Sequence, residues 1–183
     1  NSGKDKLTYS LGAFYENNEM QSELKDESLS NKSINNTSLD RSGLYVKGSY
    51  FKKLNDFSIN LKGTLSYLNQ SLPQVQLEKQ NFLFNPSLNL KYDLNNSSSL
   101  NVASGFKNNS QPFSNLFTYP VLISFRTLIS NKPDLTLSKT FKYGANYWYT
   151  DTYNNFSINT GITIDEIRDN FIATQNISQN QLF

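Results

Sequence analysis

The 183-residue chain contains no cysteine and no histidine. Without cysteine it has neither a disulfide framework nor a thiolate nucleophile, and without histidine it lacks the usual zinc or haem ligand and the usual acid–base group. It has no apolar run of about 18 residues, so no segment reads as a membrane-spanning helix. The formal net charge is only +2, which is too small to indicate nucleic-acid binding.

Hydrophobic residues are also scarce, at 37% of the chain, whereas 26 asparagines and 24 serines make up more than a quarter of it. A soluble β-sandwich needs many side chains for its core. A transmembrane barrel needs only an outward apolar band, because its interior is polar. The composition is therefore compatible with both classes.

The stretch DFSINLKGTLSYLNQ, residues 56–70, alternates between apolar and polar residues almost without a break. Period-two alternation is typical of a β-strand with one apolar and one polar face. The apolar set is Phe57, Ile59, Leu61, Gly63, Leu65 and Tyr67, and the polar set is Ser58, Asn60, Lys62, Thr64 and Ser66. The apolar face of this strand must contact either a protein core or lipid.

The alternation recurs along the chain. Strands are expected at residues 6–17, 42–52, 56–70, 82–94, 99–107, 135–150 and 156–164, with a weaker eighth strand from 171 to the end. Short polar turns (53–56, 95–98, 151–155) alternate with longer connections (18–40, 73–80, 108–134), as in outer-membrane barrels. We therefore expect an all-β fold, an antiparallel meander of about eight strands forming part of a transmembrane outer-membrane β-barrel.

Aromatic residues bracket two of these strands. Phe57 and Tyr67 are ten positions apart, and so are Phe82 and Tyr92. Ten residues span roughly 33 Å of strand, which corresponds to roughly 25 Å of height at a tilt of about 40°. This height matches that of the apolar band between the two aromatic girdles of a transmembrane barrel. The opposite parity should face the barrel interior: Ser58, Asn60, Lys62, Thr64, Ser66, Asn89, Lys91, Asn101, Lys107, Lys142 and Asn146.

Two stretches resemble a known family. NPSLNLKYDLNNSSSLNVASGFKNN (85–109) and NKPDLTLSKTFKYGANYWYTDTYNNFSINTGITIDEIRDNFI (131–172) are similar to consecutive strand–turn–strand segments of TonB-dependent outer-membrane receptors from Bacteroidota-type bacteria. Those receptors carry a G-N-P-x-L-x-P-E-like signature. Here it reads Asn131-Lys132-Pro133-Asp134-Leu135, with Ser130 in place of glycine and Leu137-Ser138 in place of Pro-Glu. The resemblance covers about half of the chain.

The resemblance implies localisation in the bacterial outer membrane, contact with the lipid bilayer, and uptake of a nutrient such as a glycan, peptide or metal chelate. Family barrels have about 22 strands and a plug domain. Residues 1–183 are then either a segment of such a barrel or a small barrel built from the same kind of hairpins, and we expect a single barrel segment, a fragment without the plug. Coupling to TonB would then require a plug in a missing N-terminal region. Two alternatives stay open: a non-transporting barrel that acts as a scaffold or partner-binding component of an envelope complex, and a secreted, adhesin-like soluble β-protein.

No catalytic constellation is found, so the protein is not expected to be an enzyme, and no cofactor or metal is expected. The acidic stretches 16–27 and 165–170 lack the glycine-turned loop of a calcium-binding EF-hand and are interpreted as solvated loops. The most apolar stretch, 111–130, falls where an extracellular loop is expected. Its large side chains predict contact with a partner, such as a surface lipoprotein, with the barrel lumen, or with a neighbouring loop. The candidate contacts are Leu116, Phe117, Tyr119 and Phe125.

Overall fold

The computed structural model describes residues 5–26, 31–116, 121–124, 127–129 and 133–169. This part of the chain is almost entirely β-structure. The strands are β1 (Asp5–Asp26), β2 (Asn31–Leu54), β3 (Phe57–Leu72), β4 (Leu77–Asn95), β5 (Ser98–Ser110), β6 (Val121–Ser124), β7 (Thr127–Ile129), β8 (Leu137–Asp151) and β9 (Phe156–Arg168). Two short 3₁₀ helices, η1 (Pro73–Val75) and η2 (Phe113–Leu116), complete it. None of the helices in these residues is long and apolar enough to cross a membrane.

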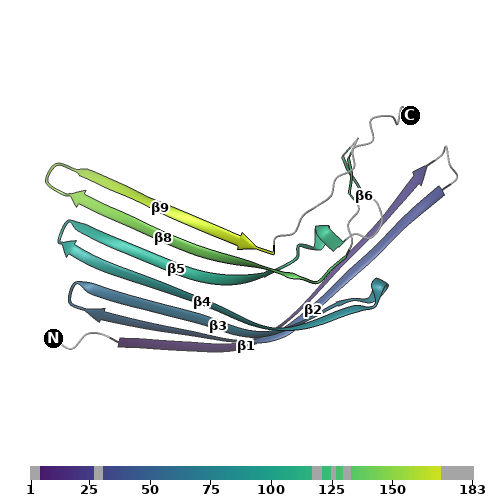
Figure 1. Ribbon diagram of the computed structural model, residues 1–183, viewed down its shortest axis with the longest axis horizontal. Helices are drawn as coiled ribbons and strands as arrows, with labels where there is room; N and C mark the ends of the chain where they lie inside the picture. The colour runs from purple at the N-terminus through teal and green to yellow at the C-terminus, as the bar shows by residue number, and fades with distance from the viewer. Residues whose placement is uncertain (1–4, 27–30, 117–120, 125–126, 130–132, 170–183) are drawn as a thin grey trace.

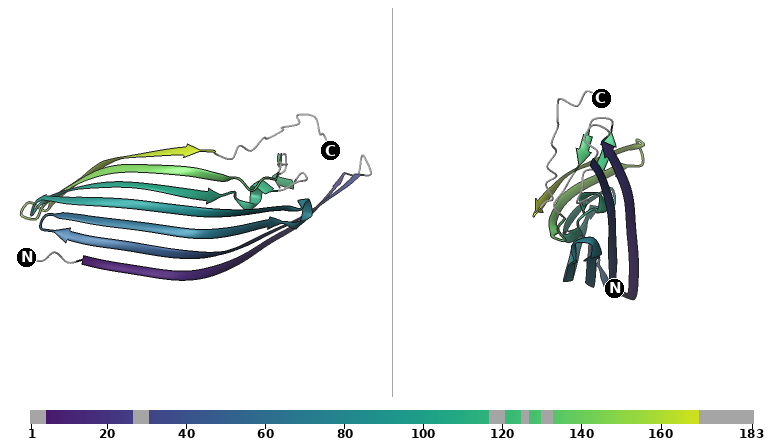
Figure 2. Two further views of the ribbon diagram at one scale, coloured as in Figure 1. Left: turned by 60° about the horizontal axis from the view of Figure 1, so that its bottom comes forward. Right: turned by 90° about the vertical axis from the view of Figure 1, so that its right-hand side faces the viewer.

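Seven strands form one antiparallel sheet in the order β1-β2-β3-β4-β5-β8-β9, and β6 and β7 form a separate small hairpin (Figure 1). The sheet is curved when seen from its end (Figure 2). It is open, with β1 and β9 as its two edges. The expected antiparallel meander is therefore confirmed for seven strands, whereas the expected eighth strand, from residue 171 to the end, lies outside the described residues.

The expectation of a long loop at residues 18–40 was wrong. β1 continues to Asp26 and β2 begins at Asn31, with paired positions from Asn18 opposite Leu39 to Asp26 opposite Asn31. Backbone pairing needs no apolar side chains, so a hairpin can continue after its alternation fades. The β1–β2 hairpin extends beyond the other strands at one end of the sheet (Figure 1).

The other two long connections also contain regular structure. The segment expected as a connection at 73–80 consists of η1 followed, after Gln76, by the start of β4. Gln76 adopts a left-handed conformation with φ of 52°, and its N–H donates to the Pro73 carbonyl. The segment 108–134 contains η2 and the β6–β7 hairpin.

The short turns lie together at the opposite end of the sheet (Figure 1). In the β2–β3 turn, Leu54 pairs with Phe57, and Asn55 has a φ of 49°. Asparagine tolerates this left-handed conformation better than most residues, and two-residue hairpin turns require it. In the β8–β9 turn the carboxylate of Asp151 accepts hydrogen bonds from the N–H groups of Tyr153 (2.9 Å) and Asn154 (3.2 Å) and from the Asn154 side chain (2.7 Å).

The hydrophobic core is small and lies at the long-loop end of the sheet. Leu39, Leu72, Leu116 and Leu135 are at most 1% exposed, and Leu77 and Phe113 pack against them. Leu116, a candidate contact with a partner, the barrel lumen or a neighbouring loop, packs against leucines of its own chain. The sequence alone could not distinguish a loop that packs on its own strands from one that contacts another molecule, because both require the same apolar residues.

We predict that Leu116→Ala destabilises this end of the sheet. Removing a fully buried leucine side chain leaves a cavity and typically costs about 2–5 kcal/mol. The loss is measurable as a lower denaturation midpoint in detergent solution. The matched control is Val75→Ala, because Val75 is 39% exposed. Equal midpoints for both variants would contradict the core assignment.

A second prediction concerns the β8–β9 turn. The hydrogen bond from the Asn154 side chain, followed by the backbone hydrogen bonds of Asn154 and Tyr153, lowers the pKa of Asp151 below its ordinary value of 3.8. A carboxyl group with a depressed folded-state pKa stabilises the folded turn above its unfolded-state pKa, and this contribution is lost as the pH falls through the folded-state value. We expect the amide chemical shifts of Tyr153 and Asn154 to titrate with a midpoint below 3.8 and to stop titrating in Asp151→Asn. A midpoint at or above 3.8 would show that these hydrogen bonds do not favour the carboxylate.

Candidate functional site: a sheet with one apolar and one polar face

The strand register places the apolar positions of all seven strands on one face. Directly paired residues in an antiparallel sheet share a face, and successive residues alternate between faces. One row across the sheet pairs Leu11 with Val46, Val46 with Leu65, and Leu65 with Phe84. At the other edge, Ala145 pairs with Ile162. This surface, the apolar face, is therefore continuous from β1 to β9.

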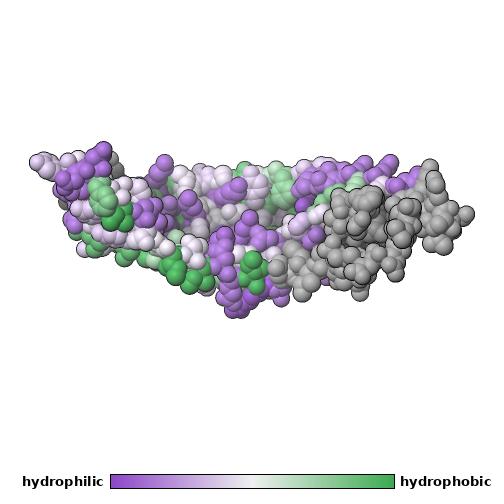
Figure 3. Space-filling view, turned by 90° about the horizontal axis from the view of Figure 1, so that it is seen from above, coloured by the Kyte–Doolittle hydropathy of each residue, from purple (hydrophilic) through white to green (hydrophobic). Residues whose placement is uncertain are grey.

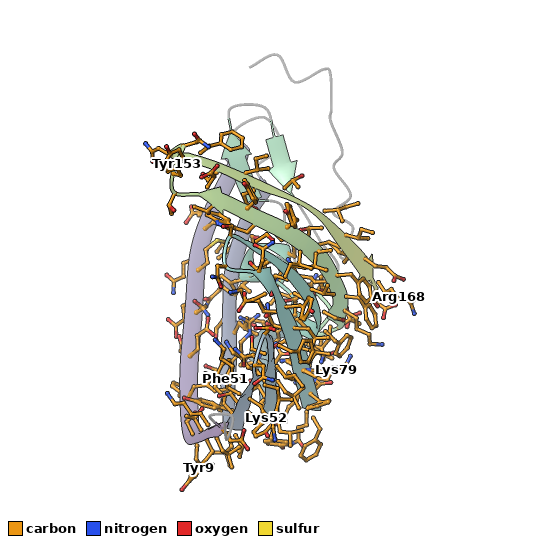
Figure 4. All side chains as sticks on the ribbon, turned by 90° about the vertical axis from the view of Figure 1, so that its left-hand side faces the viewer. Tyr9, Phe51, Lys52, Lys79, Tyr153 and Arg168 are labelled. Carbon is orange, nitrogen blue, oxygen red and sulfur yellow. The ribbon has the colours of Figure 1, made fainter. Side chains whose placement is uncertain are left out.

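Many large side chains on the apolar face are solvent-accessible. Tyr9 is 86% and Phe82 is 88% exposed. Other exposed members are Leu7, Leu11, Tyr15, Leu44, Val46, Leu61, Leu65, Phe84, Leu88, Tyr92, Leu100, Val102, Tyr143, Ile158, Ile162 and Ile164. Tyr9 points away from the sheet in the end view of Figure 4. In the space-filling view, hydrophobic and hydrophilic groups both reach the surface of the described part (Figure 3).

The two aromatic pairs noted in the sequence lie in cross-strand register on the apolar face. Phe57 pairs with Tyr92 near the short turns, and Tyr67 pairs with Phe82 nearer the loops. The Tyr67 and Phe82 rings are 5.1 Å apart between centroids, in a tilted arrangement. The two strands thus carry two aligned aromatic positions with aliphatic residues between them.

The opposite face, called the polar face below, contains every residue that the sequence assigned to the barrel interior. On β3 and β4, Ser58 pairs with Lys91 and Asn60 with Asn89. The other members come from the same parity of their strands: Lys62, Thr64 and Ser66 on β3, Asn101 and Lys107 on β5, and Lys142 and Asn146 on β8. The structure thus brings these residues onto one surface.

Basic side chains outnumber carboxylates among the described residues of the polar face. The basic residues are Lys6, Arg41, Lys47, Lys53, Lys62, Lys79, Lys91, Lys107 and Lys142, and the acidic residues are Glu16, Asp26, Asp93 and Asp165. Three of these acids have cationic neighbours: Lys91 is 2.7 Å from Asp93, Lys142 is 2.9 Å from Asp165, and Arg41 is 3.7 Å from Glu16. The polar face therefore carries an excess of positive charge, although the net charge of the whole chain is only +2.

The apolar segment 111–130 contributes to this same face at its loop end. Leu116 packs against Leu39 and Leu72, both of which have polar-face parity. Phe117, Tyr119 and Phe125, the other candidate contacts, lie outside the described residues.

A buried polar cluster adjoins the small core. The Arg41 guanidinium, 12% exposed, donates to the backbone carbonyl of Gln111 at 2.5 Å. Gln70, which pairs with Arg41 across β2 and β3, is 1% exposed. The Arg41 Nε, Gln70 Oε1 and Gln111 Oε1 atoms are buried without a hydrogen-bond partner in the structure. Sequence reasoning missed this cluster because its members are about 30 to 70 positions apart along the chain.

Two of the aromatic residues on the polar face, Phe14 and Tyr45, cover glycines, a role that sequence reasoning missed. Tyr45 lies over Gly12, where an added Cβ would come within 2.5 Å of the tyrosine ring. Phe14 lies over Gly43, where the corresponding distance is 2.8 Å. Each ring covers the backbone of a cross-strand glycine, an arrangement known as aromatic rescue. Which aromatic residue lies over which glycine depends on the register between β1 and β2, so the pairs cannot be identified from the sequence alone.

The two acidic stretches, interpreted from the sequence as loops, lie mostly in strands, since β1 extends to Asp26 and β9 to Arg168. They form ion pairs within the sheet. In addition to the Asp165–Lys142 contact, Glu166 accepts a hydrogen bond from Arg168 at 2.6 Å. Glu16 contacts Arg41 and accepts from the Asn18 side chain at 2.5 Å. Within the described residues, no group of three or more potential metal-ligating side chains is found.

Comparison with known proteins adds no relative to this description: no protein-family model, no curated protein and no solved structure matches the chain.

Proposed function

We propose that this chain is part of a transmembrane β-barrel in a bacterial outer membrane, with its apolar face against lipid. The observation that carries the proposal is the apolar face itself. It extends over all seven strands, and its large side chains are exposed while the small core lies at one end of the other face. Soluble monomers rarely expose so many neighbouring apolar residues.

The energetics favour a lipid cover for this face. Burying a valine, leucine, isoleucine or phenylalanine side chain contributes about 1.5–3 kcal/mol, so leaving many of them in water carries a large cost. The aligned pairs Phe57–Tyr92 and Tyr67–Phe82 are placed as two aromatic girdles would be, on either side of an aliphatic band. A protein partner would remove the same cost but would not require this banded arrangement.

The polar face would then line the interior of the barrel. Its amides, hydroxyls and lysines are suited to a water-filled or plugged lumen and poorly suited to hydrocarbon. Alternation of lipid-facing and interior-facing residues along each strand is the pattern expected of such a wall.

The finer proposal is that the barrel belongs to a TonB-dependent receptor for nutrient uptake. Its support is the resemblance of residues 82–172 to that family, together with a meander that matches the strand–turn–strand order of the resemblance. Coupling to TonB requires a plug region, and a surface lipoprotein is the proposed partner for the loop side. The proposal includes no catalytic step.

A second candidate is a barrel that does not transport and instead serves as a scaffold in an envelope complex. The packing of η2 favours it, because Leu116 and Phe113 lie over the polar face at the loop end and cover part of it. An encoded plug domain and TonB-box, followed by loss of nutrient uptake on deletion of the gene, would favour the receptor. A complete gene without them would favour the scaffold.

The lipid contact predicts a parity effect at the middle of the sheet. We expect Leu61→Lys and Leu90→Lys each to cost about 2–4 kcal/mol of folding free energy in a bilayer, because these positions would lie near the midplane. The matched controls are Asn60→Lys and Asn89→Lys, which lie one residue away on the polar face and should change stability little. Urea titration of folding into phosphatidylcholine vesicles measures all four variants, each made in the full-length protein.

If lysine lowers the folding free energy equally at the apolar-face and the polar-face positions, the assignment of the apolar face to lipid is ruled out. Partition of the folded protein into the aqueous phase without detergent would instead support a secreted, soluble adhesin-like protein.

A further inference from the structure

The polar face contains a shallow groove over β1, β2 and β3. Two rows of paired residues line it: Thr8, Ser49 and Lys62 form one, and Ser10, Lys47 and Thr64 form the other. Each row thus supplies one lysine and two hydroxyl groups. Tyr9, Gly48 and Gly63 line the groove from the intervening positions.

The two lysines of this groove have no carboxylate partner among the described residues. Lys91 and Lys142, elsewhere on the polar face, form ion pairs with Asp93 and Asp165. Lys47 and Lys62 are diagonal neighbours on adjacent strands, because Lys47 pairs with Thr64 and Lys62 pairs with Ser49. Like charges in such positions repel each other, and a bound anion would relieve the repulsion.

Neighbouring residues position Lys47. Its Nζ atom lies 4.5 Å from the centroid of the Tyr45 ring, a cation–π distance. The Tyr45 ring in turn lies over Gly12, whose missing side chain leaves room for it. On the other side of the groove, the hydroxyls of Thr8 and Ser49 lie 2.5 Å apart, within hydrogen-bonding distance. The lysine and the hydroxyl groups are therefore held by contacts within the sheet.

We propose that this groove binds a tetrahedral oxyanion, phosphate or sulfate, either free or as a group on a small solute. Two ammonium groups match the charge of a dianion. Lysine and hydroxyl groups donate hydrogen bonds to its oxygens, and bonds to a charged acceptor are stronger than neutral ones. The choice of a soluble ligand rests on the proposed function. If the polar face lines the barrel interior, it is opposite the lipid face, so a solute and not a lipid headgroup would reach the groove.

The test is direct binding to the full-length protein, folded in a neutral detergent, by isothermal titration calorimetry at low ionic strength. The probes are inorganic phosphate, inorganic sulfate and glucose 6-phosphate, with glucose as the uncharged comparison. We expect the anions to bind and glucose not to bind. We expect Lys47→Gln combined with Lys62→Gln to weaken phosphate affinity by about tenfold or more. Binding should also weaken as salt increases, because the lysines are exposed.

The matched control is Lys53→Gln combined with Lys107→Gln. These lysines lie on the same face outside the groove, and the double substitution changes the net charge equally. We expect the control to retain phosphate affinity within about twofold. Circular dichroism verifies that both variants are folded. Glucose 6-phosphate binding without inorganic phosphate binding would indicate an organic phosphate ligand, and the reverse would indicate the free ion; either result supports the site.

Three results would overturn the inference: absence of anion binding, equal weakening in the groove and control variants, or unchanged affinity in the groove variant. These outcomes are separate from those of the membrane proposal. If anions fail to bind while Leu61→Lys still disrupts membrane folding, only the oxyanion site fails. If anions bind while the two parities tolerate lysine equally, the membrane proposal fails and the groove remains.

Discussion

The register of the backbone hydrogen bonds between strands is the constraint on which the rest of the structure depends. A shift of one residue between any two strands would move every side chain of one strand to the other face. The register is continuous across β1 to β3, so a row such as Leu11, Val46 and Leu65 stays on one side. Side-chain alternation within each strand and pairing between strands together produce two chemically different surfaces.

The same register explains why so little conventional core is needed. The small core lies at one end of the sheet, where the loop segment packs against the strands, and consists of Leu39, Leu72, Leu116 and Leu135. Elsewhere the described sheet is one layer thick, and stability must come from backbone pairing and from whatever covers its apolar face. A low hydrophobic content of 37% is sufficient for that arrangement, because only half of the strand positions need apolar side chains.

Much of this could be predicted from alternation alone. The strands at 56–70 and 82–94 and the residues of each face follow from period-two patterns, and the structure places Asn60 and Asn89 on the same face, as those patterns predict. The extension of β1 and β2 could not be predicted, because the alternation fades there while the backbone remains paired. The pairing of Lys47 with Thr64 and the packing of Tyr45 over Gly12 depend on register between distant segments, which one sequence does not reveal.

The open edges of the sheet have a consequence for assembly. On the outer side of β1 and of β9, the backbone N–H and C=O groups that point outward have no neighbouring strand of the sheet. Water can satisfy such groups, but hydrocarbon cannot, and each one left unpaired there costs several kcal/mol. A seven-stranded sheet of this kind can therefore enter a bilayer only together with further strands that pair along both edges. Insertion and edge pairing would have to occur as one cooperative event.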